Sequence, residues 1–240
     1  MQSLKFLGRG SAFNTAEGNT SAYFIKDNIF FLLDCGEMIF HTLKENDKLK
    51  NIIEKNNIKD IHIYITHLHS DHVGSLSSLI YYCYYILRIT PKIHHPQKES
   101  GSYTYFVLNQ LLRIQGHVKE YEYEKTPYEG IYTQECLHDD NLKSYSYIID
   151  KLNYKKIFYS GDCRELHASD LTNINSGFFD EVYLECSLNE NPVHMSINYL
   201  DNVICRDRSL REKIYLMHID NPKLISMAKQ FGFKVVELNG

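Results

Sequence analysis

The sequence predicts an α/β sandwich, two mixed sheets flanked by helices, and three observations lead to this fold class. Strand-like segments come first, helical and strand-like segments then alternate, and strands and helices return toward the end of the chain. Hydrophobic residues make up 43% of the 240 residues, which is enough to build a substantial core. No linker, repeat or low-complexity segment divides the sequence. We therefore expect a single domain over residues 1–240.

The first half of the chain is expected to build one sheet with helices beside it. Short apolar runs predict strands, and apolar residues at helical spacing predict helices. The predicted strands are Leu4–Leu7, Ala22–Ile25, Ile29–Leu33 and Ile61–Ile65, and the predicted helices are Glu37–Asn56 and Gly74–Ile89. The glycine-rich loop after the first strand lacks the lysine and the following helix of a phosphate-binding loop, so we do not interpret it as one.

The second half is expected to supply the other sheet. Between Lys92 and Thr133 the pattern is irregular, apart from a predicted helix over Phe106–Ile114. A hairpin is predicted around the polar turn Asp150–Tyr154. Its strands are Tyr145–Ile149 and Lys156–Tyr159, two further strands are Glu181–Leu184 and Lys213–Leu216, and the closing helix is Pro222–Phe231.

Composition excludes several classes of protein. The net charge is −4, so a broad basic surface for gripping long nucleic acid is not expected. No apolar stretch approaches the roughly 20 residues that cross a bilayer. The chain begins directly with a strand-like segment, and its six cysteines form no C-x-x-C pair. We expect a cytoplasmic protein with reduced thiols.

The most informative motif is His67-x-His69-x-Asp71-His72, which directly follows an apolar strand. Alternate residues of an extended chain point the same way, so His67 and His69 can converge on one metal ion. Asp71 and His72 lie at the start of the next turn and can reach a second ion. Imidazole and carboxylate suit zinc, and also manganese or iron. A polar loop with a chance cluster of histidines is the alternative.

Three further residues of the ligand type each follow an apolar strand. They are His138, Asp162 and His218. Taken singly, each is as well explained as a surface or core residue. Together with the first motif they make seven ligands, enough for two metal ions that share Asp162.

The string Thr66–Gly74 (THLHSDHVG), with His138, Asp162 and His218 following in that order, resembles the metallo-β-lactamase fold superfamily. The resemblance spans nearly the whole chain and implies an αβ/βα sandwich with two divalent metal ions, zinc or manganese. It implies that one ion is bound by His67, His69 and His138, the other by Asp71, His72 and His218, with Asp162 between them. It also implies that the buried Asp34 orients a ligand; a simple strand-end turn is the alternative for Asp34.

The start of the chain and the segment after Asp162 resemble the ribonuclease Z branch of this superfamily. The carried-over residues are Glu185 and His194, the latter in His194-Met195-Ser196. The resemblance implies that His194 donates a proton to the leaving oxygen and that Glu185 orients it. Asp71 is expected to be essential for turnover. The alternative for His194 is a helix cap near Ser196.

One departure from that branch bears on the substrate. RNA-processing members carry a long arm between the third and fourth metal motifs, whereas Asp162 follows His138 by 24 positions here. The sequence is most similar to the phage anti-Pycsar cyclic-nucleotide phosphodiesterases. This similarity implies hydrolysis of cyclic CMP and cyclic UMP, and of other 3′,5′-cyclic nucleotides, which counters antiviral signalling. The alternatives are a ribonuclease Z-like endonuclease, another small phosphodiesterase, a cyclic-nucleotide sponge, and lactam or thioester hydrolysis.

The helix Leu76–Ile89 is apolar on almost every face, whereas a helix at the surface of one subunit needs only one apolar face. We expect a homodimer through this helix, since the corresponding helix of the ribonuclease Z branch lies near the subunit contact. Burial within one subunit is the alternative. The Tyr-rich stretch Tyr103–Tyr132 offers rings that could stack on a base, but no residue in it is singled out.

Overall fold

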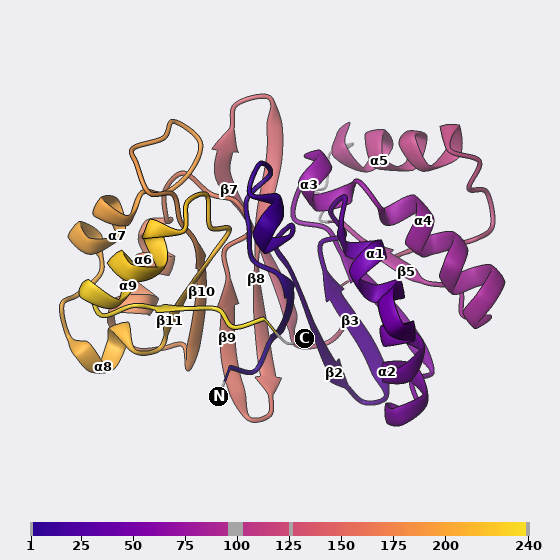
Figure 1. Ribbon diagram of the computed structural model, residues 1–240, viewed down its shortest axis with the longest axis horizontal. Helices are drawn as coiled ribbons and strands as arrows, with labels where there is room; N and C mark the ends of the chain where they lie inside the picture. Colours follow the sequence, from indigo (N-terminus) through magenta and orange to yellow (C-terminus); the bar gives the residue numbers. More distant parts are fainter. Residues whose placement is uncertain (1, 96–102, 125–126, 239–240) are drawn as a thin grey trace.

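The computed structural model describes residues 2–95, 103–124 and 127–238 and contains two six-stranded sheets that face each other (Figure 1). The first sheet has the order β1-β2-β3-β4-β5-β6. Its first three strands pair antiparallel and the others parallel. The strands are β1 (Lys5–Gly8), β2 (Ser21–Lys26), β3 (Ile29–Leu33), β4 (Asp60–Tyr64), β5 (Lys92–His94) and β6 (Glu122–Glu124).

The second sheet has the order β12-β11-β10-β9-β8-β7. Strands β9 to β12 run parallel, and the β7–β8–β9 meander is antiparallel. The strands are β7 (Ile131–Asp139), β8 (Leu142–Leu152), β9 (Lys155–Tyr159), β10 (Glu181–Glu185), β11 (Ile214–Met217) and β12 (Lys234–Val235).

Helices cover the outer face of each sheet, so the molecule has four layers (Figure 1). Beside the first sheet lie α1 (Ile39–Lys44), α2 (Lys48–Asn56), α3 (Ser70–Val73), α4 (Leu76–Tyr81) and α5 (Tyr103–Ile114). Beside the second lie α6 (Ala168–Asn175), α7 (Ile197–Val203), α8 (Arg208–Arg211) and α9 (Lys223–Gln230). The short 3-10 segments are Thr15–Glu17 and Glu45–Asp47. The predicted αβ/βα sandwich is confirmed.

Three apolar clusters hold the layers together. The middle one joins the two sheets and contains Phe6, Phe31, Tyr147 and Tyr159, all fully buried. The other two join each sheet to its helices. Because apolar burial is the main driving force for folding, this arrangement fixes the two sheets against each other. The edge where their strands end is therefore a rigid platform.

The structure differs from the sequence prediction where turn chemistry interrupts an apolar pattern. The predicted helix Glu37–Asn56 is broken into α1 and α2, because Asn46 and Asp47 adopt a positive φ that stops a helix. The predicted helix Gly74–Ile89 begins as α4 and continues as a π-helix over Tyr82–Leu87. The hairpin strands are longer than predicted. Its turn is only Asn153 and Tyr154, both with positive φ, as a tight two-residue turn requires.

The strand β7 and the short strands β5 and β6 were not predicted, because polar residues interrupt their apolar pattern. His138 was predicted to lie just beyond a strand, but it lies within β7. No helix of the described residues is long and apolar enough to cross a membrane.

Candidate metal centre

Four strand ends bring the predicted ligands to one edge of the sandwich. Strand β4 leads into the motif that begins at Thr66, and α3 carries its last two ligands. His138 lies next to the end of β7, while Asp162 and His218 follow β9 and β11. Strands β9 and β11 run parallel to β10, and β7 runs in the same direction because two antiparallel pairings separate it from β9. The ends of β7, β9 and β11 therefore lie at the same edge of the second sheet, and the motif after β4 meets them there, since His69 contacts His138 and Asp71 contacts His218.

The first group of side chains is His67, His69 and His138. Nε2 of His67 lies 2.9 Å from Nδ1 of His69, and Nε2 of His138 lies 3.2 Å from the same atom. Burial lowers the pKa of His67 well below its usual range and also lowers the pKa of His138. Neutral rings at neutral pH have a free lone pair, which is the form that binds a metal ion.

The second group is Asp71, His72, Asp162 and His218, all buried. Oδ2 of Asp71 lies 3.3 Å from Nε2 of His218 and 3.4 Å from Nε2 of His72. Burial acts to raise the pKa of Asp162, but the charges of His218 and His72 outweigh it and hold that pKa well below the usual range. Burial also acts to raise the pKa of Asp71, but the hydrogen bonds of His218 and His72 outweigh it and hold that pKa far below the usual range. Both carboxylates are therefore ionised and present oxygen ligands.

Asp162 lies between the two groups. Its Oδ2 atom is 3.4 Å from Nε2 of His72 and 3.3 Å from Nε2 of His218. The same oxygen is 3.9 Å from Nε2 of His67 and 3.9 Å from Nε2 of His138. A single carboxylate thus reaches both groups.

The outward nitrogens of three rings are held by hydrogen bonds, so their inward nitrogens face the cluster. Nδ1 of His67 donates to Oγ1 of Thr66 (3.0 Å), and Nδ1 of His138 donates to the carbonyl of Val193 (2.7 Å). Nδ1 of His72 donates to Oδ2 of Asp34 (2.8 Å). Such outer bonds fix the ring orientation and tautomer of metal-binding histidines.

This arrangement fits a divalent cation. Nε2 of His72 is buried without a hydrogen-bond partner, although it points at two carboxylates. Buried polar atoms are rarely left unpaired, and nitrogen and oxygen donors converging on one point are what zinc or manganese requires. One group that could hold an ion is His67, His69 and His138, and another is Asp71, His72, Asp162 and His218. Two overlapping groups add His194, one with His138 and Asp162 and one with Glu185 and His218.

Asp34 holds two parts of the predicted motif in place through hydrogen bonds. It ends β3 with a positive φ of 62°, and its side chain is fully buried. Besides the bond from His72, it accepts hydrogen bonds from the backbone N–H of Thr66 (2.7 Å) and from the Thr66 hydroxyl (2.8 Å). The residue thus does more than end a strand, because its carboxylate contacts two parts of the predicted motif.

His194 lies at the rim of the cluster, with its side chain 20% exposed. Its Nδ1 donates to Oε2 of the fully buried Glu185 (2.9 Å). Burial acts to lower the pKa of His194, but the hydrogen bond to Glu185 and the charge of that carboxylate raise it to about 9. The helix cap is made by Ser196, whose side chain accepts from the N–H of Tyr199. The alternative interpretation of His194 as a cap is therefore wrong.

The whole chain matches one protein family. The family model described as anti-Pycsar protein Apyc1 matches residues 2–237. The chain belongs to the anti-Pycsar family. A protein of the same name from Paenibacillus harenae is 26% identical over 228 residues, which cover 90% of this chain and 88% of that protein.

Solved structures show the same fold for this anti-Pycsar family member. The metallo-β-lactamase fold protein YhfI from Bacillus subtilis aligns with a TM-score of 0.69 at 16% identity, covering 97% of this chain and 94% of that one. The short form of human tRNase Z aligns with a TM-score of 0.66 at 17% identity, covering 98% and 96%. The predicted family and fold are confirmed. Fold and cluster together support divalent metal binding and a metal-dependent hydrolase.

Sequence reasoning assigned no role to two residues that shape the centre. Thr66 bonds both Asp34 and His67, and its place at the start of the histidine motif was the available signal. Gly36 allows the backbone of Asp71 to approach closely, since a Cβ at Gly36 would lie 1.9 Å from the Asp71 carbonyl oxygen. The sequence holds no signal for that second contact, because it joins segments far apart in the chain.

Replacing Gly36 by alanine is expected to displace Asp71. The overlap should destabilise the protein by about 1–3 kcal/mol. It should also weaken zinc binding by about 10- to 100-fold, as changes in the surroundings of metal ligands do. Gly177→Ala is the matched control: this glycine has a φ of +74°, so the change costs stability away from the cluster. Zinc titration followed by calorimetry compares the two, and equal affinities in both variants would contradict the expected role of Gly36.

Proposed function

We propose that this chain is a metal-dependent phosphodiesterase that hydrolyses 3′,5′-cyclic nucleotides to nucleoside 5′-monophosphates. Cyclic CMP and cyclic UMP are the proposed main substrates, with cyclic AMP and cyclic GMP as further ones. The observation that carries the proposal is the convergence of seven metal-ligand side chains next to the Glu185–His194 pair. Membership of the anti-Pycsar family supports the substrate class. The proposed cofactors are two zinc ions, with manganese as a substitute.

The proposed chemistry divides the work between the cluster and its rim. Bound divalent ions supply a nucleophile at neutral pH and offset negative charge on the phosphate oxygens. His194 holds a proton at neutral pH, since its pKa is about 9. It lies at the exposed rim, where it can give that proton to the departing 3′ oxygen. Glu185 keeps the ring in place through Nδ1, which leaves Nε2 to act.

The segment between His138 and Asp162 favours a small substrate. Strands β8 and β9 fill this interval and pair within the second sheet, and their turn needs only two residues. No protruding arm interrupts this segment, all of which lies among the described residues. An arm of that kind is what the ribonuclease Z branch uses to hold RNA, so we propose a small phosphodiester and no long nucleic acid.

Incubating the metal-loaded protein with a panel of substrates tests the proposal. Cyclic CMP and cyclic UMP should yield 5′-monophosphates by chromatography. Precursor tRNA, a cyclic ribose phosphate and a β-lactam should be turned over at least about 100-fold more slowly, given how sharply a built polar site discriminates. Faster cleavage of precursor tRNA would support the endonuclease alternative. Binding of cyclic CMP without product would support the sponge alternative and contradict hydrolysis.

We propose that this activity acts in the cytoplasm, which for a phage gene is the host cytoplasm, and removes a cyclic-nucleotide signal. Five of the six free cysteines are buried, as expected for thiols that only pack. In cells that express it, the protein should be found in the cytoplasmic fraction, and the cellular level of cyclic CMP should be lower than in cells without it. An unchanged cyclic CMP level, with active protein present, would contradict this role.

We further propose a homodimer through the helix that α4 and the following π-helix form. Leu76, Leu79 and Ile80 are buried in this subunit, while Tyr85 and Ile86 remain 45% and 64% exposed. Exposed apolar residues of the adjoining segment extend this surface, namely Leu111, Ile114 and Val118. An apolar patch of this kind commonly marks an interface.

Light scattering at micromolar concentration is expected to give twice the chain mass of 28.2 kDa. Ile86→Lys should shift the mass to that of one chain, because a charge would be buried in the interface. Tyr132→Lys is the control, since Tyr132 is 57% exposed on β7, away from this helix. A monomeric wild-type protein would contradict the proposal.

A further inference from the structure

The side chain of Phe13 is almost fully exposed, with 98% of the residue accessible to solvent. Phenylalanine is among the residues most often buried in folded proteins. Phe6, Phe30 and Phe31 follow that rule and are fully buried. The high exposed fraction of Phe13 leaves both faces of its ring free, so another flat ring can stack on it.

Phe13 belongs to the loop of residues 9–20 between β1 and β2, where it lies in a tight turn. The N–H of Asn14 donates to the carbonyl of Ser11 (3.1 Å), which closes a β-turn with Ala12 and Phe13 at its two central positions. Both ends of the turn are attached to Ile219. Its carbonyl accepts hydrogen bonds from the N–H of Ser11 (3.2 Å) and from Nδ2 of Asn14 (2.7 Å).

The same loop contacts both segments that carry the second ligand group. The residue to which the turn is attached follows His218 directly, and the N–H of His218 donates to Oγ1 of Thr20 (3.1 Å). Gly36 lies between Asn19 and Asp71, since a Cβ there would be 2.7 Å from the Asn19 Cβ and 1.9 Å from the Asp71 carbonyl oxygen. In Figure 1 the loop is the indigo segment at the top, at the edge where α3 begins and β7 ends. Phe13 is therefore carried at the rim of the metal centre.

Hydrogen bonds across the loop keep it in one conformation. The N–H of Gly10 donates to the carbonyl of Gly18 (2.7 Å), and the N–H of Arg9 donates to the carbonyl of Glu17 (3.0 Å). The guanidinium of Arg9 also contacts the carboxylate of Glu17 at 2.7 Å. A ligand that contacts Phe13 does not have to order this loop, which lowers the entropic cost of binding.

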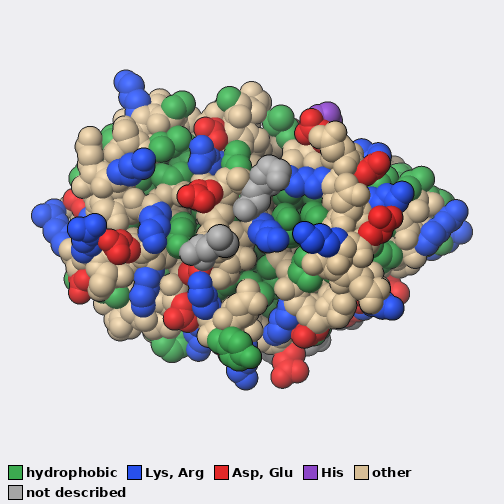
Figure 2. Space-filling view, turned by 60° about the horizontal axis from the view of Figure 1, so that its bottom comes forward, with side chains coloured by type: hydrophobic (Ala, Val, Ile, Leu, Met, Phe, Trp, Pro, Cys, Tyr) green, Lys and Arg blue, Asp and Glu red, His purple; other side chains and the backbone are tan. Residues whose placement is uncertain are grey.

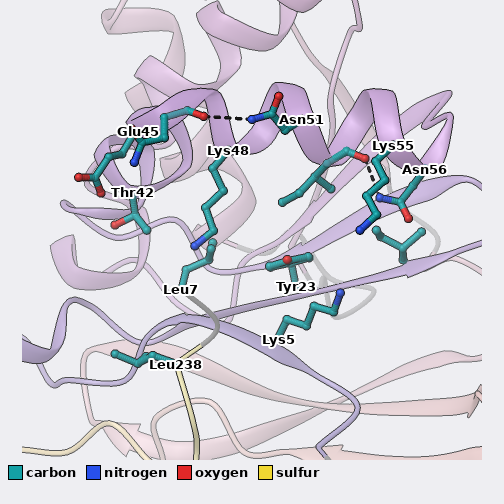
Figure 3. Close-up of a pocket in the computed structure, with 13 residues that line it drawn as sticks. Lys5, Leu7, Tyr23, Thr42, Glu45, Lys48, Asn51, Lys55, Asn56 and Leu238 are labelled. Carbon is teal, nitrogen blue, oxygen red and sulfur yellow. Dashed lines mark hydrogen bonds between the residues drawn. The ribbon is translucent and has the colours of Figure 1, made fainter.

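The largest cavity described in the protein offers no comparable ring. It lies between α2 and the strands β1 and β2 and has a volume of about 560 Å³ (Figure 3). Tyr23 lies in its wall, but this residue is only 5% exposed and stacks on Phe30, with ring centroids 5.2 Å apart. The ammonium of Lys5 lies 5.7 Å from the centre of the same ring. Tyr23 therefore has no free face for a ligand.

We propose that Phe13 stacks on the nucleobase of the substrate. This inference rests on the proposed hydrolysis of cyclic nucleotides. With the phosphate at the ligand groups, the ribose holds the base beside the metal centre, at the rim to which the loop of Phe13 belongs. A phenyl ring has no donor or acceptor to select one base, and stacking works with every base. The residue therefore suits a site that takes pyrimidine and purine cyclic nucleotides alike.

Steady-state kinetics on the zinc-loaded full chain tests the proposal. Phe13→Ala should raise the KM for cyclic CMP by about 5- to 100-fold, the range expected for the loss of one base–aromatic stack. The value of kcat should stay that of the wild type, because the ring does not touch the bonds that react. Phe13→Tyr keeps an aromatic face and should keep the wild-type KM. Phe13→Leu is apolar without a ring and should resemble Phe13→Ala.

Tyr154→Ala is the matched control. Tyr154 is also fully exposed in a turn, but β9 runs from that turn toward Asp162, so Tyr154 lies at the opposite end of the sheet from the metal centre. Figure 2 brings that edge forward and shows acidic and basic side chains around small groups of hydrophobic ones. The KM of Tyr154→Ala should be unchanged. A cyclic ribose phosphate lacks the base, so its slow turnover should be equal in Phe13→Ala and the wild type.

Calorimetry with cytidine 5′-monophosphate, which is not consumed, separates this proposal from the proposed function. If the wild type fails to hydrolyse cyclic CMP but binds the monophosphate about 5- to 100-fold more tightly than Phe13→Ala does, the hydrolysis is wrong and the base contact stands. If Phe13→Ala, Phe13→Leu and the wild type hydrolyse cyclic CMP with the same KM, the base contact is wrong and the hydrolysis stands. The proposal is also overturned if the monophosphate does not bind, or binds Phe13→Ala and the wild type equally. A changed mass of Phe13→Ala in light scattering would assign the ring to a contact between two copies and would overturn it as well.

Discussion

Replacing Asp71 by asparagine should reduce the rate of cyclic-nucleotide hydrolysis by on the order of 10³-fold or more. Electrostatic stabilisation of the transition state is the largest contribution to the rate enhancement in sites of this kind. Asparagine has the shape of aspartate but lacks its charge. Asp71 lies 3.3 Å from His218 and 3.4 Å from His72, so this charge serves the second ligand group directly. Initial rates with cyclic CMP at saturating zinc measure the effect.

Asp60→Asn is the matched control for this substitution. Asp60 is a partly buried aspartate outside the cluster: it belongs to β4 and pairs with Lys92 and His62. It should keep wild-type turnover. A melting curve of the Asp71→Asn protein should show a folded chain, since the isosteric side chain leaves no cavity. Full activity in zinc-saturated Asp71→Asn would mean that the ligand assignment is wrong.

Replacing His194 by glutamine should lower kcat by about 10²- to 10⁴-fold, the usual contribution of a positioned general acid. Zinc content and KM should change little, because His194 is not one of the seven proposed ligands. Glutamine can still bond Glu185, so the surrounding loop should hold its shape. Steady-state kinetics with cyclic CMP separate kcat from KM.

A substrate with a good leaving group gives a further test of that role. Its leaving oxygen needs no proton, so the His194→Gln protein should hydrolyse bis(p-nitrophenyl) phosphate at close to the wild-type rate. His41→Gln, at an exposed position on α1, is the control for loss of a histidine. If both substrates slow equally in His194→Gln, the residue has another role than proton donation.

The ligand motifs were predictable because they are local. The motif from His67 to His72 follows an apolar strand, and strand ends gather at one edge of a sheet whatever the loops between them do. The prediction for Asp162 and His218 rested on the same rule. The same rule was applied to His138, and there its detail was wrong, because His138 lies within β7 and not beyond a strand.

The features of the site that the sequence did not predict depend on contacts between segments far apart in the chain. Gly36 touches the backbone of Asp71, and Thr20 accepts a hydrogen bond from the N–H of His218, which adopts a positive φ of 57°. Hydrophobic periodicity does not indicate which distant segments come into contact.

The most direct test of the metal centre is a crystal structure of the protein grown with zinc, with anomalous diffraction measured at the zinc absorption edge. Two anomalous peaks are expected between the described ligand groups, one beside His67, His69 and His138 and one beside Asp71, His72 and His218, with Asp162 contacting both. An empty cluster at saturating zinc, or zinc bound only elsewhere, would contradict the account.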